Sequence, residues 1–492
     1  MHRHHLMRFP ILPLVLSAIV TCPSTVAAEN VGTVSVEGDS FILDGAPFYY
    51  VGCNNYYLMV FAADPGLRSY VEEVQAEAAG LGLTVLRTWA FNDGAGQWNA
   101  LQTSPGVYQE YVFEGLDYVL NLADEYGLRV ILPLVNDWDD YGGMNQYVAW
   151  SGTASAHDDF YSDENCRSWY KDHVYTVLNR VNTFNGRVYR EDPTVFAWEL
   201  ANEPRCESDP TGATLGEWIV EMSSYIKSID AAHLVTTGSE GFYGPAGPDH
   251  NPHSWMSSLG VDFVPHHAVE TIDFACIHGW PDWWGMDYAQ SMSWMSDHID
   301  DSTELLGKPV ILEEFGKQRP VETRDLFFQG WFDEIYQAAQ AGEAAGGSNL
   351  WILYHDDYPD YDGFGVYCPE DSSTCGIIAA EAERMNSLVA AGVEDAGQVG
   401  LRGPAIRSFP NPFNPAVSIE YAVPADGPVL LAVYDLCGRM VRTLVDRGHP
   451  AGVHTARWDG RDVTGAEMGS GVYFALLKVE ESQAIRKLVL IR

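Results

Sequence analysis

The sequence predicts a (β/α)8 barrel of the TIM-barrel type, class α/β, followed by a small all-β domain. Between about residues 45 and 390, eight short apolar segments alternate with amphipathic stretches, which is typical of a parallel sheet covered by helices. The last 85 or so residues contain short alternating segments separated by turn residues, which is typical of an Ig-like β-sandwich. The charge changes at the same place: residues 1–401 include 59 acidic and 17 basic residues, whereas residues 402–492 include 9 acidic and 11 basic residues.

The N-terminal segment 1–28 has the features of a signal peptide. Arginines flank its start, the apolar run 11–20 is too short to span a bilayer, and small residues offer a cleavage position at 26–28. Cys22 would suit a lipoprotein signal, but Thr21 before it fits that signal poorly. We therefore expect a secreted, extracellular protein whose mature chain does not insert into a membrane.

The barrel is predicted to occupy 29–392, a polar linker 393–407, and the β-sandwich 408–492. The eight predicted strands cover, in chain order, 48–53, 83–89, 128–135, 194–200, 233–238, 272–280, 309–315 and 349–355. Amphipathic stretches between them, one of which ends at Gly127, predict the helices. The largest insertion, 136–193, follows the third strand, is rich in Trp and Tyr, and is expected to lie over the carboxyl ends of the strands.

The chain is strongly acidic, with 68 Asp and Glu against 28 Lys and Arg and a net charge of −40. This charge argues against nucleic acid as a partner, because phosphate binding needs clustered basic residues. Adaptation to high salt and an ordinary acidic secreted enzyme both remain open as explanations.

The eight cysteines have no metal-ligand spacing, and no metal or cofactor is expected. Cys368 and Cys375 lie in one short loop and are candidates for a disulfide, and Cys166 with Cys206 forms a weaker candidate pair. Two further cysteines lie in apolar strand-like segments and are expected to be buried thiols: Cys53 and Cys276.

Carboxylates stand at the ends of two predicted strands. Asn202-Glu203 ends the fourth strand just before a proline, and Glu313-Glu314 ends the seventh. Reactive groups of such barrels lie at the carboxyl ends of the strands, and glycosidic-bond cleavage needs two carboxylates across one sugar. Glu313 and Glu314 are expected to face opposite ways, and the mid-strand Glu199 is expected to be a buried ion-pair partner.

Several segments together carry a family resemblance. "RTWAFNDG", "LVNDWDDYGG", "RVNTFNGRVYREDPTVFAWELANEPRC", "EGFYG", "IDFACIHGWPDWW" and "KPVILEEFGK" resemble, in order, the endo-β-1,4-mannanases of glycoside hydrolase family 5. The resemblance covers about residues 40–390. It implies an enzyme, a mannan endo-1,4-β-mannosidase that acts on mannan, galactomannan or glucomannan by double displacement.

The resemblance implies that Glu203 is the general acid/base and Glu314 the nucleophile. Arg87 would keep the nucleophile ionised, and the Glu314 charge would raise the pKa of Glu203 so that it keeps its proton. The family motif Glu-Phe-Gly matches residues 314–316, so the resemblance selects Glu314 rather than Glu313 as the nucleophile. As a purely structural alternative, Arg87 would only neutralise buried carboxylates.

The remaining site residues also follow from the resemblance. Asn202 would bind the 2-hydroxyl of the sugar in the −1 site, and His278 would position the acid/base and the substrate. Trp351 would form the floor of the −1 site, Trp138 would stack on a further sugar, and Arg205 would contact the leaving-group side. The alternative for the histidine and the two tryptophans is a role in packing.

The strand-six motif departs from the family pattern. The family has His-x-Tyr-Pro with a tyrosine hydroxyl on the nucleophile, whereas this chain has His278-Gly-Trp280-Pro. An indole N–H can donate a hydrogen bond but cannot accept one. We therefore expect Trp280 in the substrate site with an altered −1 geometry.

The C-terminal segment 408–492 resembles the sorting domains of type IX-secreted proteins, which are related to the Ig-like domain of flagellar-hook capping. This implies a contact with secretion machinery, with cleavage of the tail or attachment to the cell surface. A carbohydrate-binding module is the alternative, but exposed aromatic residues are few and Trp458 lies in a structural turn.

The leading prediction is thus that the protein is an endo-mannanase, and we expect it to be a monomer. An exo-β-mannosidase or a β-glucanase on the same barrel is the first alternative, and a non-catalytic mannan-binding protein is the second. The acidic loop 355–363 lacks the spacing of an EF-hand and is expected to be a solvated loop.

Overall fold

The computed structural model describes residues 32–394 except 248–249 and 369, and residues 405–492 except 410–412, 414, 424, 436–437, 480–481 and 491. The predicted signal peptide 1–28 lies outside the described residues. Most of the predicted linker 393–407 does too; its first two residues belong to a helix and its last three to a strand.

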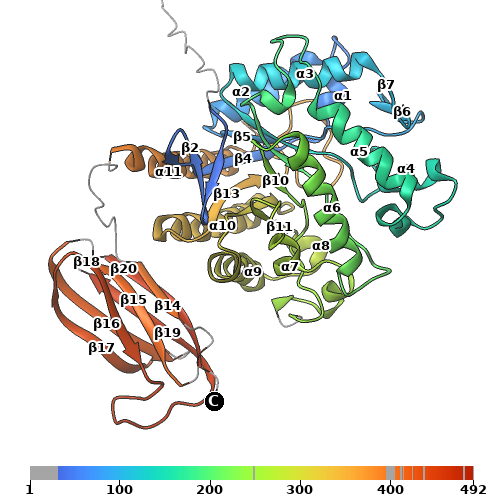
Figure 1. Ribbon diagram of the computed structural model, residues 1–492. Helices are drawn as coiled ribbons and strands as arrows, with labels where there is room; N and C mark the ends of the chain where they lie inside the picture. The colour runs from blue at the N-terminus through green and yellow to red at the C-terminus, as the bar shows by residue number, and fades with distance from the viewer. Residues whose placement is uncertain are drawn as a thin grey trace, which may run out of the picture.

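Eight parallel strands form a barrel, as predicted (Figure 1). Along the sheet the order is β10-β9-β8-β5-β4-β13-β12-β11. The two outer strands meet through Asp273, whose N–H donates to Val235 O at 2.8 Å, and Thr236, whose Oγ1 donates to Phe274 O at 3.1 Å. The strands are β4 (Tyr50–Asn54), β5 (Val85–Arg87), β8 (Arg129–Pro133), β9 (Val195–Glu199), β10 (Leu234–Thr236), β11 (Ala275–Gly279), β12 (Val310–Phe315) and β13 (Ala345–Leu350).

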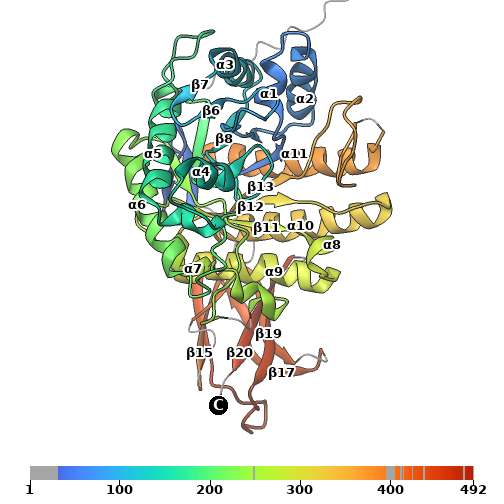
Figure 2. The ribbon, with the colours of Figure 1, turned by 90° about the vertical axis from the view of Figure 1, so that its right-hand side faces the viewer.

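Helices surround this sheet (Figures 1 and 2). They are α1 (Leu58–Ala62), α2 (Arg68–Gly80), α3 (Glu110–Glu125), α4 (Gly143–Ser151), α5 (Glu164–Leu178), α6 (Ala213–Ile229), α7 (Phe263–His267), α8 (Pro281–Trp284), α9 (Tyr288–Asp301), α10 (Val321–Ala341) and α11 (Ser372–Glu394). Short helical turns lie at His157–Tyr161, Tyr189–Glu191, Ser254–Ser258 and Ser302–Leu306, and a two-stranded sheet joins β6 (Gln102–Ser104) to β7 (Val107–Tyr108). No helix in the described ranges combines the length and apolar character needed to cross a bilayer.

Aromatic rings seal the amino-terminal end of the barrel. A small antiparallel sheet of β1 (Ser35–Glu37), β2 (Ser40–Leu43) and β3 (Ala46–Pro47) carries the buried Phe41. The Phe41 ring lies 5.3 Å from the rings of both Phe196 and Phe274, in edge contact. Because this end is filled by side chains, a ligand can enter only from the carboxyl ends of the strands.

The eighth strand lies earlier than predicted. β13 covers Ala345–Leu350, whereas the apolar pattern indicated 349–355. A Cβ at Gly346 would lie 2.3 Å from a Phe41 ring carbon, and one at Gly347 would lie 2.6 Å from a Tyr50 ring carbon. Glycine is therefore needed where the strand passes the aromatic seal, and a glycine-rich strand carries no apolar pattern.

The C-terminal region contains two antiparallel sheets with a common apolar core. One has the order β14-β15-β18 and the other β17-β16-β19-β20, and buried residues of both sheets belong to one cluster that includes Trp458. The structural role predicted for Trp458 is confirmed by its burial, but it ends strand β18 and does not lie in a turn. The Ig-like class stays a prediction. The strands are β14 (Ala405–Phe409), β15 (Val417–Val423), β16 (Gly427–Asp435), β17 (Met440–His449), β18 (Gly452–Trp458), β19 (Gly471–Val479) and β20 (Ser482–Leu490).

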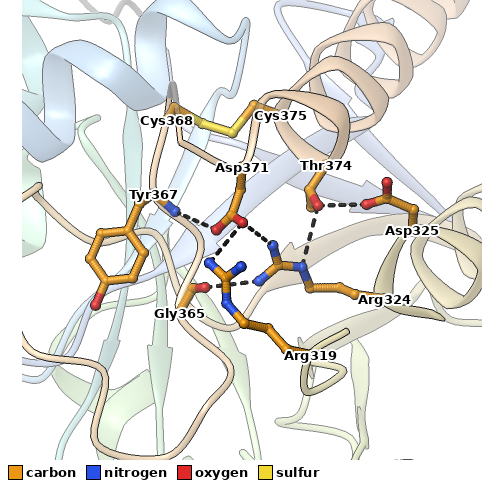
Figure 3. Close-up of a disulfide and its surroundings, with 9 residues drawn as sticks. All are labelled: Arg319, Arg324, Asp325, Gly365, Tyr367, Cys368, Asp371, Thr374 and Cys375. Carbon is orange, nitrogen blue, oxygen red and sulfur yellow. Dashed lines mark hydrogen bonds and ion pairs between the residues drawn. A yellow bond between two sulfur atoms is a disulfide. The ribbon is translucent and has the colours of Figure 1, made fainter. Parts of the chain in front are cut away.

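Cys368 and Cys375 form the predicted disulfide (Figure 3). The weaker candidate pair is wrong: Cys166 and Cys206 are free and buried. Cys166 lies within helix α5, and Cys206 Sγ lies 3.6 Å from Ser208 Oγ, so each sulfur has its own packed environment. The other two cysteines are buried free thiols, as predicted: Cys53 and Cys276.

Candidate active site

A cavity of about 630 Å³ opens at the carboxyl ends of the barrel strands. It brings together seven of the nine predicted site residues, while Arg87 and His278 lie fully buried beside it. The cavity is lined by Tyr56, Trp89, Asn136, Trp138, Asp140, Tyr141, Asn202, Glu203, Arg205, Glu240, Trp255, Trp280, Trp283, Trp284, Glu314, Trp351, Tyr361 and Asp362.

Glu203 has an unusual backbone conformation. Its φ is +52°, in the left-handed region that residues with a Cβ avoid. Its N–H donates to Gly238 O at 2.9 Å, and a Cβ at Gly238 would lie 1.9 Å from Ala201 O. The close approach of the neighbouring loop thus holds the turn in place. Strained backbone that persists in this way is typical of functional positions.

Glu203, Glu314 and His278 converge on one point. One carboxylate oxygen of each glutamate and one ring nitrogen of the histidine all lie within 4.8 Å of one another. His278 Nδ1 lies 2.6 Å from Glu203 Oε1 and 3.4 Å from Glu314 Oε2. The carboxyl groups of retaining glycosidases are about 5–5.5 Å apart, whereas those of inverting enzymes are about 6.5–9.5 Å apart.

Arg87 connects the two strands that carry the glutamates. Its Nε and Nη2 each donate to Glu199 at 2.6 Å, and Nη2 also donates to Asn202 Oδ1 at 2.7 Å. Nη1 donates to Glu314 Oε1 in a short hydrogen bond. Glu199 is therefore the buried ion-pair partner that the sequence indicated. Asn202 is fixed further by its Nδ2, which donates to Asn136 Oδ1 at 2.9 Å.

The prediction that Glu313 and Glu314 face opposite ways is only partly correct. Glu314 lines the cavity and Glu313 does not. However, Glu313 also lies near the same cations, 4.0 Å from Arg87 Nε and 3.7 Å from His278 Nε2. The pairing of β12 shifts register against both neighbouring strands in this stretch. The irregularity turns both side chains toward the barrel interior, which strict alternation forbids.

The two glutamates have the opposite pKa order from that predicted. Burial disfavours ionisation of Glu203, but the hydrogen bond and positive charge of His278, with Arg205 and the Trp138 N–H, outweigh it and lower the pKa of Glu203 to about 2. Burial outweighs His278 and Arg87 at Glu314 and raises its pKa. The pKa of His278 is raised well above its usual value despite burial, because three carboxylates surround it. These opposite shifts favour a protonated His278 that is hydrogen-bonded to an ionised Glu203.

One wall of the cavity supports Glu203. Trp138 Nε1 donates to Glu203 Oε2 at 2.6 Å, and the Arg205 guanidinium lies 4.8 Å from the centre of the Trp138 ring. Arg205 in turn donates to both carboxylate oxygens of Glu240, at 2.7 and 2.6 Å. Trp138 and Arg205 line the cavity as predicted, but Trp138 Nε1 and the Nε and Nη2 atoms of Arg205 already have protein partners.

Trp280 and Trp351 form the opposite corner. Their rings are in edge contact with centres 5.8 Å apart, and Trp351 also stacks on Tyr56 at 5.6 Å. Trp351 Nε1 donates to Asp362 Oδ2 at 3.1 Å. Within the described part of the chain, the buried Trp280 Nε1 has no hydrogen-bond partner. The indole therefore does not take over a contact with Glu314.

Sequence reasoning missed several residues of this cavity. Glu240 follows the fifth strand just as Glu203 follows the fourth, so the rule that found one carboxylate could have found the other. Part of the loop expected to be merely solvated lines the cavity through Tyr361 and Asp362. The other missed aromatic residues are Tyr56, Trp89, Tyr141, Trp255, Trp283 and Trp284. Four of them lie in segments that carry the family resemblance, whereas Tyr56 and Trp255 have no such signal.

Comparison with known proteins places this geometry in a family. Residues 32–356 match the family described as "GH family 5 beta-mannosidase-like". A mannan endo-1,4-beta-mannosidase 1 of Oryza sativa subsp. japonica is 43% identical over 377 residues, which cover 73% of this chain and 87% of that protein.

Two solved structures are also similar. An endo-1,4-beta-D-mannanase from Thermotoga petrophila RKU-1 is 38% identical, with a TM-score of 0.63 over 68% of this chain and 99% of that one. An endo-1,4-beta-mannanase from Rhizomucor miehei is 31% identical, with a TM-score of 0.65 over 72% of this chain and 100% of that one.

Proposed function

Because the chain belongs to the GH family 5 beta-mannosidase-like family, matched over residues 32–356, we propose that it hydrolyses internal β-1,4-mannosidic bonds with retention of configuration. The observation that carries the proposal is the meeting of Glu203, Glu314 and His278 within 4.8 Å at the open end of the barrel. That spacing leaves room for a nucleophile on one side of a sugar carbon and an acid on its leaving oxygen.

In the proposed mechanism Glu314 attacks the anomeric carbon, and the glycosidic oxygen leaves with a proton delivered by Glu203. His278 Nδ1 lies 2.6 Å from Glu203 Oε1, and the opposite pKa shifts of the two groups favour this proton on His278 in the free site. As Glu314 loses its charge during the attack, His278 loses a stabilising partner, which favours transfer of its proton to Glu203 and on to the leaving oxygen in the same step. Glu203 then takes a proton from water, which attacks the intermediate.

Endo action is supported by aromatic rings on both sides of the two carboxylates. Trp138 and Trp255 line the cavity on one side and are 40% and 42% exposed, and Tyr361 on the other side is 75% exposed. A chain that passes through the cavity can contact rings in both directions. The long segment after β8 contributes only residues near its start to the lining, and its helices α4 and α5 pack outside the cavity, which disfavours the exo-acting alternative.

Product analysis tests the substrate and the mode of action. Incubation with linear mannan, galactomannan and cellulose should release manno-oligosaccharides of mixed length from the first two and little from cellulose. Mannose as the sole early product would favour exo-β-mannosidase action, and faster release from cellulose would favour a β-glucanase. Binding of mannan without hydrolysis would support the non-catalytic alternative.

We also propose that the protein is exported as a monomer and that the region 408–492 serves its sorting. The Cys368–Cys375 disulfide supports an oxidising compartment, and the two C-terminal sheets fit a compact accessory domain. N-terminal sequencing of protein recovered from the producing cells and their medium tests export. A mature chain outside the cells that begins near residue 29 supports the proposal, and an uncleaved intracellular chain contradicts it.

A further inference from the structure

His157 is a half-buried histidine in the long segment after β8, close to the wall that supports Glu203. One ring nitrogen, Nε2, lies 2.8 Å from the backbone oxygen of Asp137, and the other, Nδ1, lies 2.8 Å from Asp158 Oδ1. Asp137 directly precedes Trp138, whose Nε1 donates to Glu203. The imidazole therefore holds the backbone one residue before the side chain that binds the acid.

The two aspartates that contact His157 also bind the segment after β9. Asp158 Oδ2 accepts from the Ser208 N–H at 2.7 Å, and Asp137 Oδ1 accepts from the Arg205 N–H at 3.0 Å. Arg205 lies two residues after the acid, in the same segment. The hydrogen bonds of His157 and its two aspartates therefore fix the segments after β8 and β9 against each other.

Both contacts of the His157 ring require it to be charged. A backbone oxygen and an ionised carboxylate only accept hydrogen bonds, whereas a neutral imidazole has one N–H to donate. Burial raises the pKa of Asp158, but the hydrogen bonds from His157 and the Ser208 N–H outweigh it and lower that pKa, which favours the ionised carboxylate. Burial lowers the pKa of His157, but the Asp137 charge and the hydrogen bonds to both aspartates outweigh it and raise that pKa. The ring thus connects the two segments as an imidazolium.

The groups that face His157 come from both segments. A second cavity of about 500 Å³ shares Trp138 and Arg205 with the active-site cavity. Burial raises the pKa of Asp137 to about 7, against the charges of His157 and Arg205. Carboxylates in excess favour a positive charge on the ring. The charged and titratable groups that line this second cavity with His157 are Asp137, Asp139, Asp158, Asp159, Arg205 and Glu207.

Resting on the proposed function, we propose that His157 is a positioning residue for the step in which Glu203 acts as the acid. Its imidazolium holds the backbone at Asp137 against the segment after β9, so that the Trp138 N–H meets Glu203 and the Arg205 guanidinium lies over the Trp138 ring. His157 lies outside the residues that line the active-site cavity and acts through this wall. When the ring loses one proton, only one of its two hydrogen bonds can remain.

Two classes of substrate test this role. Cleavage of mannopentaose needs a protonated leaving oxygen, whereas an aryl manno-oligosaccharide with an activated leaving group does not. An asparagine amide matches the position of Nδ1, so His157→Asn keeps a donor for Asp158 but loses the one for Asp137 O. It should lower kcat/KM for mannopentaose about tenfold, the size of one charge-assisted hydrogen bond, and kcat/KM for the aryl substrate less than about twofold. His157→Gln, whose amide matches Nε2, should recover most of the loss.

Amide hydrogen exchange measures the positioning without relying on activity. At about pH 6, peptides that span 137–161 and 203–208 should exchange faster in His157→Asn than in the wild type, because the acceptors of the Arg205 and Ser208 N–H groups are no longer held in place. At high pH the wild-type ring has also lost a proton, so the difference between the two proteins should shrink. His454→Asn is the matched control, because this histidine of the C-terminal region contacts a backbone oxygen, Pro450 O, at 2.8 Å. It should change neither measurement.

A loss on mannopentaose alone, together with faster exchange in these two segments, supports the positioning role. Equal losses on the two substrates, an unchanged kcat/KM for mannopentaose, or unchanged exchange in the two segments would overturn it. If the wild type cleaves neither substrate, the proposed function itself fails. The exchange experiment distinguishes that failure, because it shows whether His157 holds the two segments even in a chain without this activity.

Discussion

The barrel mouth and the C-terminal region bury different kinds of side chain. At the mouth, four glutamates, one arginine and one histidine with low exposure surround one another: Glu199, Glu203, Glu313, Glu314, Arg87 and His278. Among the described residues of 405–492, the buried side chains include no charged, amide or histidine group. Burying charge is costly unless partners or chemistry offset it. The comparison therefore locates reactivity in the barrel and a packing role in the C-terminal core.

The contrast between the two regions would fail most clearly if the enzyme stayed active after losing a carboxylate at the barrel mouth. Glu314→Ala should lower kcat on mannan by several orders of magnitude, because it removes the attacking group of the first step. The measurement is the initial rate of reducing-sugar release. Glu322→Gln, an exposed glutamate on α10, serves as the matched control and should keep wild-type activity. A Glu314→Ala enzyme of undiminished rate would contradict the assignment.

Glu203→Gln should have the next largest effect, about 10²–10⁴-fold on mannan, the usual range for a general acid. An aryl mannoside or aryl manno-oligosaccharide whose leaving group needs no protonation should lose far less in its first step. Rates on both substrates, measured side by side, check this difference. Equal losses on the two substrates would assign Glu203 a role other than proton transfer.

The variant His278→Asn tests whether His278 holds the proton that it shares with Glu203. In the wild type the pair loses its proton only as the pH passes the raised pKa of His278, so activity should persist well above pH 6.5, the usual histidine value. Without the imidazolium the proton depends on Glu203 alone. The basic limb of the kcat/KM profile should then move to lower pH. A basic limb at the wild-type position would show that His278 does not hold the proton.

The raised pKa of His278 also makes the free energy of unfolding depend on pH. A histidine whose pKa is raised by folding stabilises the folded state fully at pH values below its pKa in the unfolded state. This contribution is lost as the pH rises through its pKa in the folded state. Thermal unfolding of the wild type relative to His278→Asn should therefore show a larger difference at pH 6 than at high pH. A shift of the basic limb in the kcat/KM profile distinguishes the loss of the His278 proton from a general loss of folded protein.

The smallest effect on activity is expected in the C-terminal region. Arg486 on β20 forms ion pairs with Asp300, Glu304 and Glu343 of the barrel part, at 2.6, 2.7 and 3.4 Å. Arg486→Glu should loosen this contact, seen as a larger radius of gyration by X-ray scattering, and leave kcat/KM on mannan unchanged.

Arg439→Glu is the matched control, since this arginine is 76% exposed and pairs with Asp435 on its own sheet. It should change neither quantity. A large loss of activity in Arg486→Glu, with Arg439→Glu unaffected, would contradict the separation of the two regions.

Much of the site could be predicted from sequence because strand ends leave a clear signal. Apolar segments located seven of the barrel strands, and family motifs at their ends indicated Glu203 and Glu314, which the structure brings together. The family and the glycoside hydrolase class were confirmed by comparison. The Cys368–Cys375 disulfide followed from its short loop.

Other features depend on contacts that no local pattern encodes. β13 is glycine-rich because Phe41 and Tyr50, about 300 residues earlier, occupy the space of its side chains. The pKa order of the two glutamates depends on His278 of β11 and on Trp138 of the segment after β8, which both hydrogen-bond to Glu203. Asp362 lies in an acidic segment that looks solvated until the fold brings Trp351 to it.

The most direct test is to trap the covalent intermediate. A 2-deoxy-2-fluoro-β-mannoside with an activated leaving group should inactivate the enzyme with a one-to-one mass increase, and peptide mapping should place the sugar on Glu314. A label on another residue would contradict the role of Glu314 as nucleophile, and the absence of an adduct together with a first product of inverted configuration would contradict double displacement.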